Sequence, residues 1–179
     1  MIEELKKNDK NFSEGLFKSY ADNVFIKLFT AIMIDELDGV KHFLSEELYN
    51  KYKNIINELK NKNLTQMYDE LNIRTSEITN INITDTEYII TFKIDARYMD
   101  YLINSDTGNY VKGNNKSRIE KNYILTFKKI IDYKNQNSIR RCPGCGASID
   151  VNDNGKCVYC STTYNLDDYD YILYNINEE

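Results

Sequence analysis

Four cysteines form a group whose spacing points to a metal ion. Cys142 and Cys145 make one C-x-x-C pair, eleven residues follow, and Cys157 and Cys160 make a second pair. Two such pairs at about this separation are typical of tetrahedral zinc, because each pair lies on a tight turn where two sulfurs converge. The sequence therefore predicts a four-thiolate zinc site.

Other uses of the four thiols stay open. Two disulfides would need an oxidising compartment, and the sequence begins without the apolar core of an export signal. A redox dithiol is usually one C-x-x-C at the start of a helix in a thioredoxin-like context, which is absent here. An iron–sulfur cluster would also take four thiolates. The spacing favours zinc over all three.

A zinc ion held by four thiolates has no open position for water or substrate. The one histidine, His42, lies a hundred residues before the first cysteine, and we expect it at the surface rather than as a ligand or a base. The expected cofactor is therefore a structural Zn2+.

Helices are predicted for the part of the chain that precedes residue 64. Apolar side chains recur every three or four positions over residues 13–33, and Ser13 with Glu14 is a helix start signal. A shorter helix is expected over about 35–42. Ser45 is the expected N-cap of a third helix, which should end at 61–63.

The apolar spacing changes from about Leu71 onward. Residues 71–83, 86–104 and 123–127 alternate between apolar and polar side chains, and 167–176 resembles a last strand. The polar stretch 105–118 is predicted as a loop. The pattern predicts an α+β fold, in which a curved antiparallel sheet packs on the N-terminal helices and a zinc ribbon is inserted before the last strand.

Charge and hydropathy narrow the possible partners. The net charge of −5 argues against a protein that mainly neutralises phosphates. Arg140, Arg141 and Lys156 flank the cysteines, so nucleic-acid binding through the ribbon is kept as an alternative, although carboxylates lie on the same module. No stretch is apolar for long enough to span a bilayer, and a cytoplasmic location is expected.

The order of these parts resembles the family named for Tim44, the mitochondrial import-motor tether. The stretch "FKSYADNVFIKLFTAIMIDELDGVKHFLSEELYNKY" is similar to the family's first helices. The run "GKCVYC" at 155–160 is similar to the end of a four-cysteine ribbon that bacterial members carry before the last strand. The resemblance covers roughly residues 12–175.

This resemblance implies a cone-shaped, nuclear transport factor two-like fold with an apolar cavity between helix and sheet. It also implies binding or transport rather than catalysis. The expected boundaries are a lead-in at 1–11, the cone domain at 12–175 with its ribbon at 140–163, and a tail at 176–179. Mitochondrial relatives reach the membrane through preceding segments, so the short lead-in leaves membrane association open.

A cavity of this kind would hold an apolar or lipid-like ligand, a peptide segment or a protein partner. An exposed strand edge would also allow a homodimer. The positions expected to line the cavity are aromatic: Phe17, Tyr20, Phe25, Phe92, Tyr98 and Phe127.

The alternative is a small pocket enzyme of the isomerase or dehydratase type, with Asp35, Asp95 or Tyr20 as the acid–base group and Tyr98 as an oxyanion donor. Asp35 instead has the setting of an exposed helix boundary. Asp95 falls on the polar side of its strand, and Tyr20 keeps the apolar register of its helix. Binding is therefore preferred to catalysis.

Overall fold

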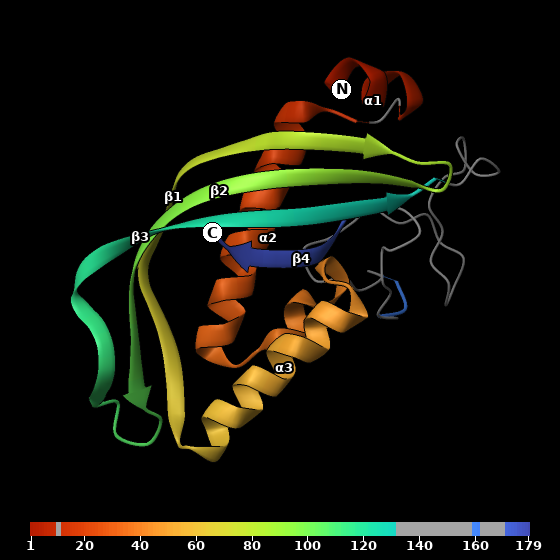
Figure 1. Ribbon diagram of the computed structural model, residues 1–179. Coiled ribbons are helices and arrows are strands. Elements are labelled where there is room, and N and C mark those ends of the chain that lie inside the picture. The colour runs from red at the N-terminus through yellow and green to blue at the C-terminus, as the bar shows by residue number, and fades with distance from the viewer. Residues whose placement is uncertain (10–11, 132–158, 162–170) are drawn as a thin grey trace.

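The helices come first along the chain and the strands follow. The computed structural model describes residues 1–9, 12–131, 159–161 and 171–179 (Figure 1). Their elements are α1 (Ile2–Asn8), α2 (Glu14–Ile34), the 3-10 helix η1 (Leu37–Phe43), α3 (Glu46–Asn61), β1 (Leu64–Ile83), β2 (Glu87–Asn104), β3 (Tyr110–Ile130) and β4 (Ile172–Glu178). The prediction of an α+β fold with helices packed on an antiparallel sheet is confirmed.

The two long helices begin where their capping residues predicted. The Ser13 side chain accepts a hydrogen bond from the Leu16 amide at 3.5 Å, and the Ser45 side chain accepts one from the Leu48 amide at 3.2 Å. Each serine thereby satisfies an amide that has no partner inside the first helical turn.

The short helix predicted over about 35–42 is present, but as the 3-10 helix η1 over Leu37–Phe43. Asp35 takes a left-handed conformation, with φ of 59°, and its amide bonds back to the Ala31 carbonyl. This cap ends α2 and reverses the chain direction. The residues that follow form the shorter and tighter η1, which starts at Leu37.

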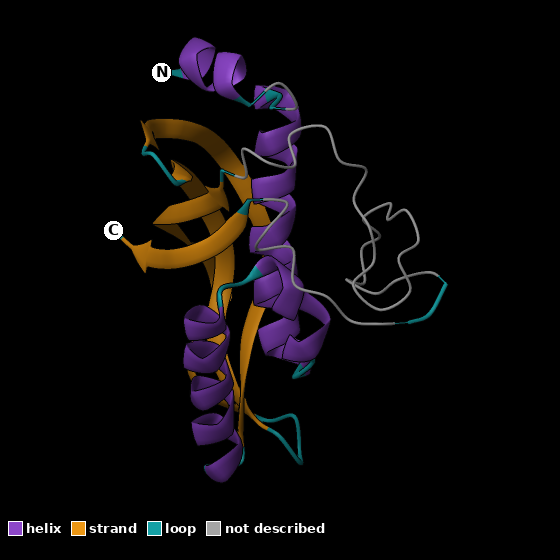
Figure 2. Cartoon of the chain, turned by 90° about the vertical axis from the view of Figure 1, so that its right-hand side faces the viewer, coloured by secondary structure: helices purple, strands orange, loops and turns teal. Residues whose placement is uncertain are grey.

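The sheet is an antiparallel meander in the order β1-β2-β3-β4. One face of β2 is buried, as its alternation predicted, and there Ile90 lies opposite Phe127 and Phe92 opposite Leu125. Helix α2 crosses the strands of the sheet, and α3 lies toward the end of the sheet at which β1 begins (Figures 1 and 2). The core lies between α2 and this face.

The three long strands bend sharply part-way along their length (Figure 1). The pairing of β1 with β2 shifts between Asp69 and Asn72, where Glu70 is left-handed with φ of 56°. On the other side of β2, Tyr98 pairs with Ile119 whereas Asp100 pairs with Asn114. Bulges of this kind bend and twist the strands that carry them.

Two strand boundaries were predicted wrongly. Strand β1 starts at Leu64 rather than near Leu71, and β3 starts at Tyr110, inside the stretch 105–118 that was predicted as a loop. Both errors fall beyond the bend, where β1 and β3 continue by pairing with β2 although their side chains do not alternate cleanly between apolar and polar.

Both chain ends contribute to the core. Leu5 of α1 is fully buried. The Asp9 carboxylate accepts hydrogen bonds from the Lys129 ammonium at 2.7 Å and from the Tyr171 hydroxyl at 3.2 Å. Strand β4 continues through residues 176–178, which had been assigned to a tail. The lead-in and the tail are thus part of the packed structure.

Candidate functional site

The six aromatic residues expected to line a cavity come together between α2 and the sheet. Five of them are almost completely buried, and Tyr20 is partly buried. The ring of Phe17 lies 5.8 Å from that of Phe92 and 5.4 Å from that of Phe127, both edge-on. Phe17, Tyr20, Phe92 and Phe127 pack on one another, whereas Phe25 and Tyr98 pack on a second group of rings that includes Phe29. We call the two groups together the aromatic core. Their role in lining a ligand cavity stays a prediction.

The tyrosine hydroxyls in and around this core are used in internal contacts. Tyr20 donates to the Tyr171 carbonyl at 2.5 Å, which ties α2 to the start of β4. Tyr98 and Tyr123 hydrogen-bond to each other through their hydroxyls. Burial raises the pKa of both these phenols well above its ordinary value, so both keep their protons at neutral pH.

The acidic candidates for catalysis lie apart from the aromatic core. Asp35 is exposed at the end of α2 and forms an ion pair with Lys60 of α3. Asp95 lies on the outer face of the sheet, paired in register with Thr75 and Asn122. Asp35 therefore has the exposed setting expected for it, and Asp95, which is partly buried, lies on the polar side of its strand as expected.

The expectation that His42 lies at the surface is wrong. The residue is only 4% exposed, and its ring packs against Phe43 with ring centres 3.8 Å apart. The reason is that η1 lies against the core and buries four of its seven residues. The exposed neighbour Lys41 gave no indication of this.

The predicted zinc ligands fall almost entirely outside the described residues. Cys142, Cys145 and Cys157 are outside them, and Cys160 lies in the described stretch 159–161, where it is exposed. The ribbon at 140–163 therefore stays a prediction. In the described part of the chain, no group of three or more histidine, cysteine or acidic side chains could hold a metal ion. No helix there is long and apolar enough to cross a bilayer.

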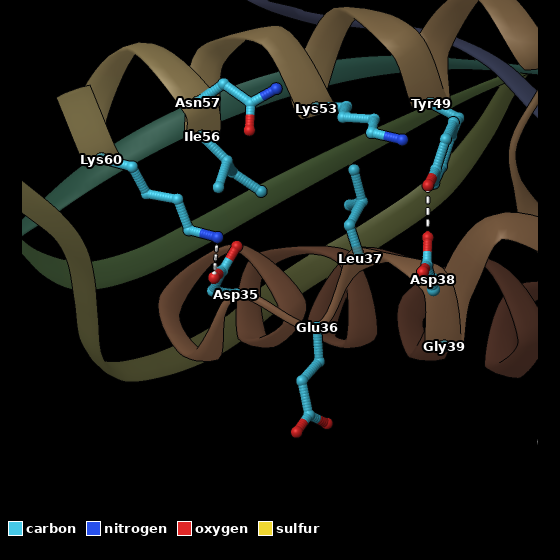
Figure 3. Close-up of a pocket in the computed structure, with 10 residues that line it drawn as sticks. All are labelled: Asp35, Glu36, Leu37, Asp38, Gly39, Tyr49, Lys53, Ile56, Asn57 and Lys60. Carbon is cyan, nitrogen blue, oxygen red and sulfur yellow. Dashed lines mark hydrogen bonds and ion pairs between the residues drawn. The ribbon is translucent and has the colours of Figure 1, made fainter.

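A pocket of about 440 Å³ lies between α3 and the segment that joins α2 to η1 (Figure 3). The sequence had not singled it out. The sequence does show an acidic run at 35–38 and lysines on one face of α3. Whether these two groups face each other depends on how η1 and α3 pack, which the sequence does not show. The lining of the pocket consists of Asp35, Glu36, Leu37, Asp38, Gly39, Tyr49, Lys53, Ile56, Asn57 and Lys60.

Two polar cross-links frame this pocket. Lys60 pairs with Asp35 at one end, and the Tyr49 hydroxyl donates to the Asp38 carboxylate at the other (Figure 3). The hydrogen bond to Asp38, together with burial, raises the pKa of Tyr49 to about 12. Tyr49 therefore remains a donor at neutral pH, and its cross-link to η1 persists.

The two sides of the pocket carry opposite charge. The η1 side presents carboxylates, whereas α3 presents lysines. The ammonium of Lys53 lies 5.5 Å from the centre of the Tyr49 ring, and that of Lys41 lies 4.9 Å from it. Such contacts favour a cation over the face of an aromatic ring. Buried Leu37 and Ile56 supply the apolar surface between the charged sides.

Comparison with protein families identifies what kind of domain carries this pocket. The model of the family described as "Tim44-like domain" matches residues 1–138, which is more than half of the chain. The chain belongs to the Tim44-like domain family. Membership of this family suggests a binding or tethering domain.

The other comparisons add little to this Tim44-like assignment. No curated protein matches the chain. Among solved structures, the crystal structure of the intermembrane space region of the chloroplast protein ARC6 is similar over 90% of this chain and 95% of that chain. The sequence identity is 7% and the TM-score is 0.46. The family match ends before Cys142, so it does not extend to the predicted zinc ligands.

Proposed function

We propose that this Tim44-like chain is a non-catalytic protein-binding domain that holds its partner at the pocket between η1 and α3. The observation that carries the proposal is the pocket itself, in which apolar surface is framed by charged side chains that belong to two different helices. The aromatic core supports the same conclusion, because its rings pack on one another. A protein partner at the surface fits these features better than a lipid enclosed in the cone.

The enzymatic alternative has one feature in its favour, namely that Tyr49 and Asp38 form a tyrosine–acid pair in the pocket. An acid–base catalyst works best when its pKa lies near the working pH. The pKa of Tyr49 is raised to about 12, which makes its proton harder to remove than that of a free phenol. This setting suits a fixed structural donor, so we prefer binding to catalysis.

A photo-crosslinking amino acid at Asn57 would test the proposal in cells that naturally make the chain. Asn57 is exposed and lines the pocket. Exposed Asn80, on β1 and outside the pocket, is the control position. A discrete protein adduct at Asn57 but not at Asn80 is expected. Equal labelling at both positions, or no adduct at Asn57, would overturn the proposal.

We also propose a structural zinc ion held by Cys142, Cys145, Cys157 and Cys160, which places the chain in a reducing compartment such as the cytoplasm. It would assign the chain to the bacterial zinc-ribbon branch of the family. The two C-x-x-C pairs support this proposal.

Native mass spectrometry with elemental analysis would test the metal assignment. One zinc ion per chain is expected, and it should be lost when any one of the four cysteines is changed to serine. A mass that shows two disulfides, or iron in place of zinc, would refute the assignment. The same spectrum gives the number of subunits and so tests for a homodimer.

A further inference from the structure

We infer that the pocket between η1 and α3 takes an acidic side chain of the partner protein, and that Lys53 recognises its carboxylate. This inference rests on the proposed protein-binding function and names the chemistry that the site would recognise. It follows from which polar groups of the pocket already have partners and which do not.

The acidic side of the pocket has little left to offer a ligand. Asp35 is paired with the ammonium group of Lys60, and Asp38 accepts a hydrogen bond from the Tyr49 hydroxyl. The third carboxylate, that of Glu36, points away from the pocket (Figure 3). A cationic side chain entering the pocket would therefore have to compete with Lys60 or with Tyr49.

The α3 side presents a cation that has no such partner. Lys53 extends along the pocket side of α3 toward Tyr49 (Figure 3). Within the part of the chain that the structure describes, no carboxylate lies within ion-pair distance of its ammonium group. That group lies 5.5 Å from the centre of the Tyr49 ring. Because an ammonium group carries three donors, it can still bind the oxygens of a carboxylate.

The surroundings of Tyr49 also favour a negative charge. Lys41 of η1 places a second ammonium group 4.9 Å from the centre of the same ring. The pKa of Tyr49 is raised to about 12, so the phenol stays neutral at physiological pH. Two cations, Lys41 and Lys53, thus lie close to a neutral ring whose hydroxyl contacts one carboxylate, Asp38. A carboxylate from the partner would offset the positive charge that remains.

The size of the pocket suits a single side chain. Its volume of about 440 Å³ lies at the small end of the range for ligand sites. Asn57 lines the pocket one helical turn beyond Lys53, and its amide can donate a second hydrogen bond. The charge belongs to Lys53 alone, so a photo-crosslinker in place of neutral Asn57 leaves the main attraction intact. Since Lys53 is exposed, the ion pair is weak and serves mainly to select among partners.

The probes are three blocked tripeptides that differ only in the central side chain: acetyl-Gly-Glu-Gly-amide, acetyl-Gly-Gln-Gly-amide and acetyl-Gly-Lys-Gly-amide. Each is titrated into the ¹⁵N-labelled chain, and the amide signals of residues 35–39 and 49–60 are followed. The Glu peptide should bind about two- to fivefold more tightly than the Gln peptide, as expected for one exposed ion pair. This preference should shrink at high salt. The Lys peptide should bind no more tightly than the Gln peptide.

Reversing the charge of Lys53 gives the sharper result. In Lys53→Glu the order should invert, so that the Lys peptide binds more tightly than the Glu peptide. Lys51→Glu makes the same charge change at an exposed residue of α3 that does not line the pocket, and should keep the original order. In cells, the adduct formed from Asn57 should weaken in Lys53→Glu but not in Lys51→Glu.

Several outcomes would overturn the inference. These are equal binding of the Glu and Gln peptides, tighter binding of the Lys peptide to the natural chain, no saturable shift with any peptide, or equal effects of Lys53→Glu and Lys51→Glu. If the Asn57 adduct forms equally well in Lys53→Glu and in the natural sequence at position 53, the acidic contact is wrong and the binding function stands. Absence of that adduct from the natural sequence as well would overturn both.

Discussion

Phe17 of α2 contacts aromatic side chains from several separate elements. Its ring contacts five other aromatic rings, which come from the segment before α2, from α2 itself, from β2, from β3 and from the start of β4. Because these rings belong to parts of the chain that are far apart in sequence, Phe17 joins the helical half of the molecule to the sheet.

Removing this ring should therefore be costly. Phe17→Ala is expected to lower the free energy of unfolding by about 3–5 kcal/mol, because it leaves a cavity surrounded by rigid rings. Urea denaturation followed by circular dichroism would measure it. Leu16→Ala changes the neighbouring side chain, which is 73% exposed, and should change stability by less than about 0.5 kcal/mol. Similar losses for both variants would contradict this account of the core.

Asp22 gives a prediction about pH. It lies on α2, where burial raises the pKa of its carboxyl above its ordinary value, although Ser76 donates a hydrogen bond to it at 3.0 Å. The folded state therefore binds the proton more tightly than the unfolded state does. It follows that this residue's contribution to stability falls as pH rises from about 4 through the raised pKa.

Asp22→Asn removes that titration and keeps an oxygen that can accept from Ser76. Its stability relative to the natural chain should rise with pH across this window and level off above it. Urea midpoints measured between pH 4 and 8 would show the trend. A difference that stays constant with pH would mean that Asp22 titrates normally.

The aromatic positions were predictable because helical and strand periodicity identify which side chains share a buried face. Phe17, Phe25 and Phe92 were assigned to the interior in this way, and all three are buried. His42 was missed because its burial comes from the way η1 packs against the core, and a short 3-10 helix leaves no clear periodicity.

At the scale of the elements, Gly113 of β3 lies beyond the bend and opposite Tyr101. Its φ is +111°, and a Cβ added there would lie 2.5 Å from the Asp100 carbonyl oxygen and 2.6 Å from the Tyr101 Cα. Both obstacles are backbone atoms of β2, which cannot move aside without breaking the pairing.

Gly113→Ala should therefore lower the free energy of unfolding by about 1–3 kcal/mol, with amide signals changing mainly in the β2–β3 hairpin. Thermal unfolding and a two-dimensional amide spectrum would test this. Gly15→Ala is the matched control, because a Cβ there meets no atom within 4 Å and the residue lies in the first turn of α2. It should be neutral or stabilise by up to about 1 kcal/mol. Equal tolerance of both changes would argue against the close approach at Gly113.

Helix boundaries were predicted better than strand boundaries, and the reason is local chemistry. Ser13 and Ser45 cap helices through contacts three residues away, so the sequence carries the signal. The start of β1 at Leu64 depends on pairing with Asn104, far along the chain, and that of β3 at Tyr110 depends on pairing with Ile103 across a hairpin. No local pattern encodes such pairing where both faces of the sheet are mixed in polarity.

At the scale of the whole molecule, β3 and β4 form an antiparallel hairpin that is interrupted in the sequence by residues 132–170. Lys128 pairs with Ile172, and the amide of Ile131 bonds to the Thr86 carbonyl. The residues on either side of this segment, Ile131 and Ile172, are thus held in place by the folded domain.

Replacing residues 132–170 with a four-residue turn should leave a folded, binding-competent domain. Closing a loop of 39 residues costs about 2 kcal/mol more than closing one of four, so the shortened chain should be up to about 2 kcal/mol more stable. Denaturation and photo-crosslinking at Asn57 would check stability and binding. If the shortened chain is destabilised or cannot fold, the predicted zinc ribbon is a necessary support for the domain.

The pocket itself could not be read from the sequence. Its two sides come from residues 35–39 and 49–60. These sides face each other only because of the angle at which α3 packs against η1. Charges such as Asp38 and Lys53 look like ordinary surface residues until that angle is known.

The interrupted hairpin also has a consequence for synthesis on the ribosome. Strand β3 is complete once Ile130 has been added, but its partner β4 follows only after the 39 residues from 132 to 170. At about 5–20 residues per second, translation leaves the edge of β3 without its neighbour for about 2–8 s. A nascent chain in that state presents open backbone hydrogen-bonding groups, so slow translation through this region should favour mispairing between neighbouring chains on the same messenger.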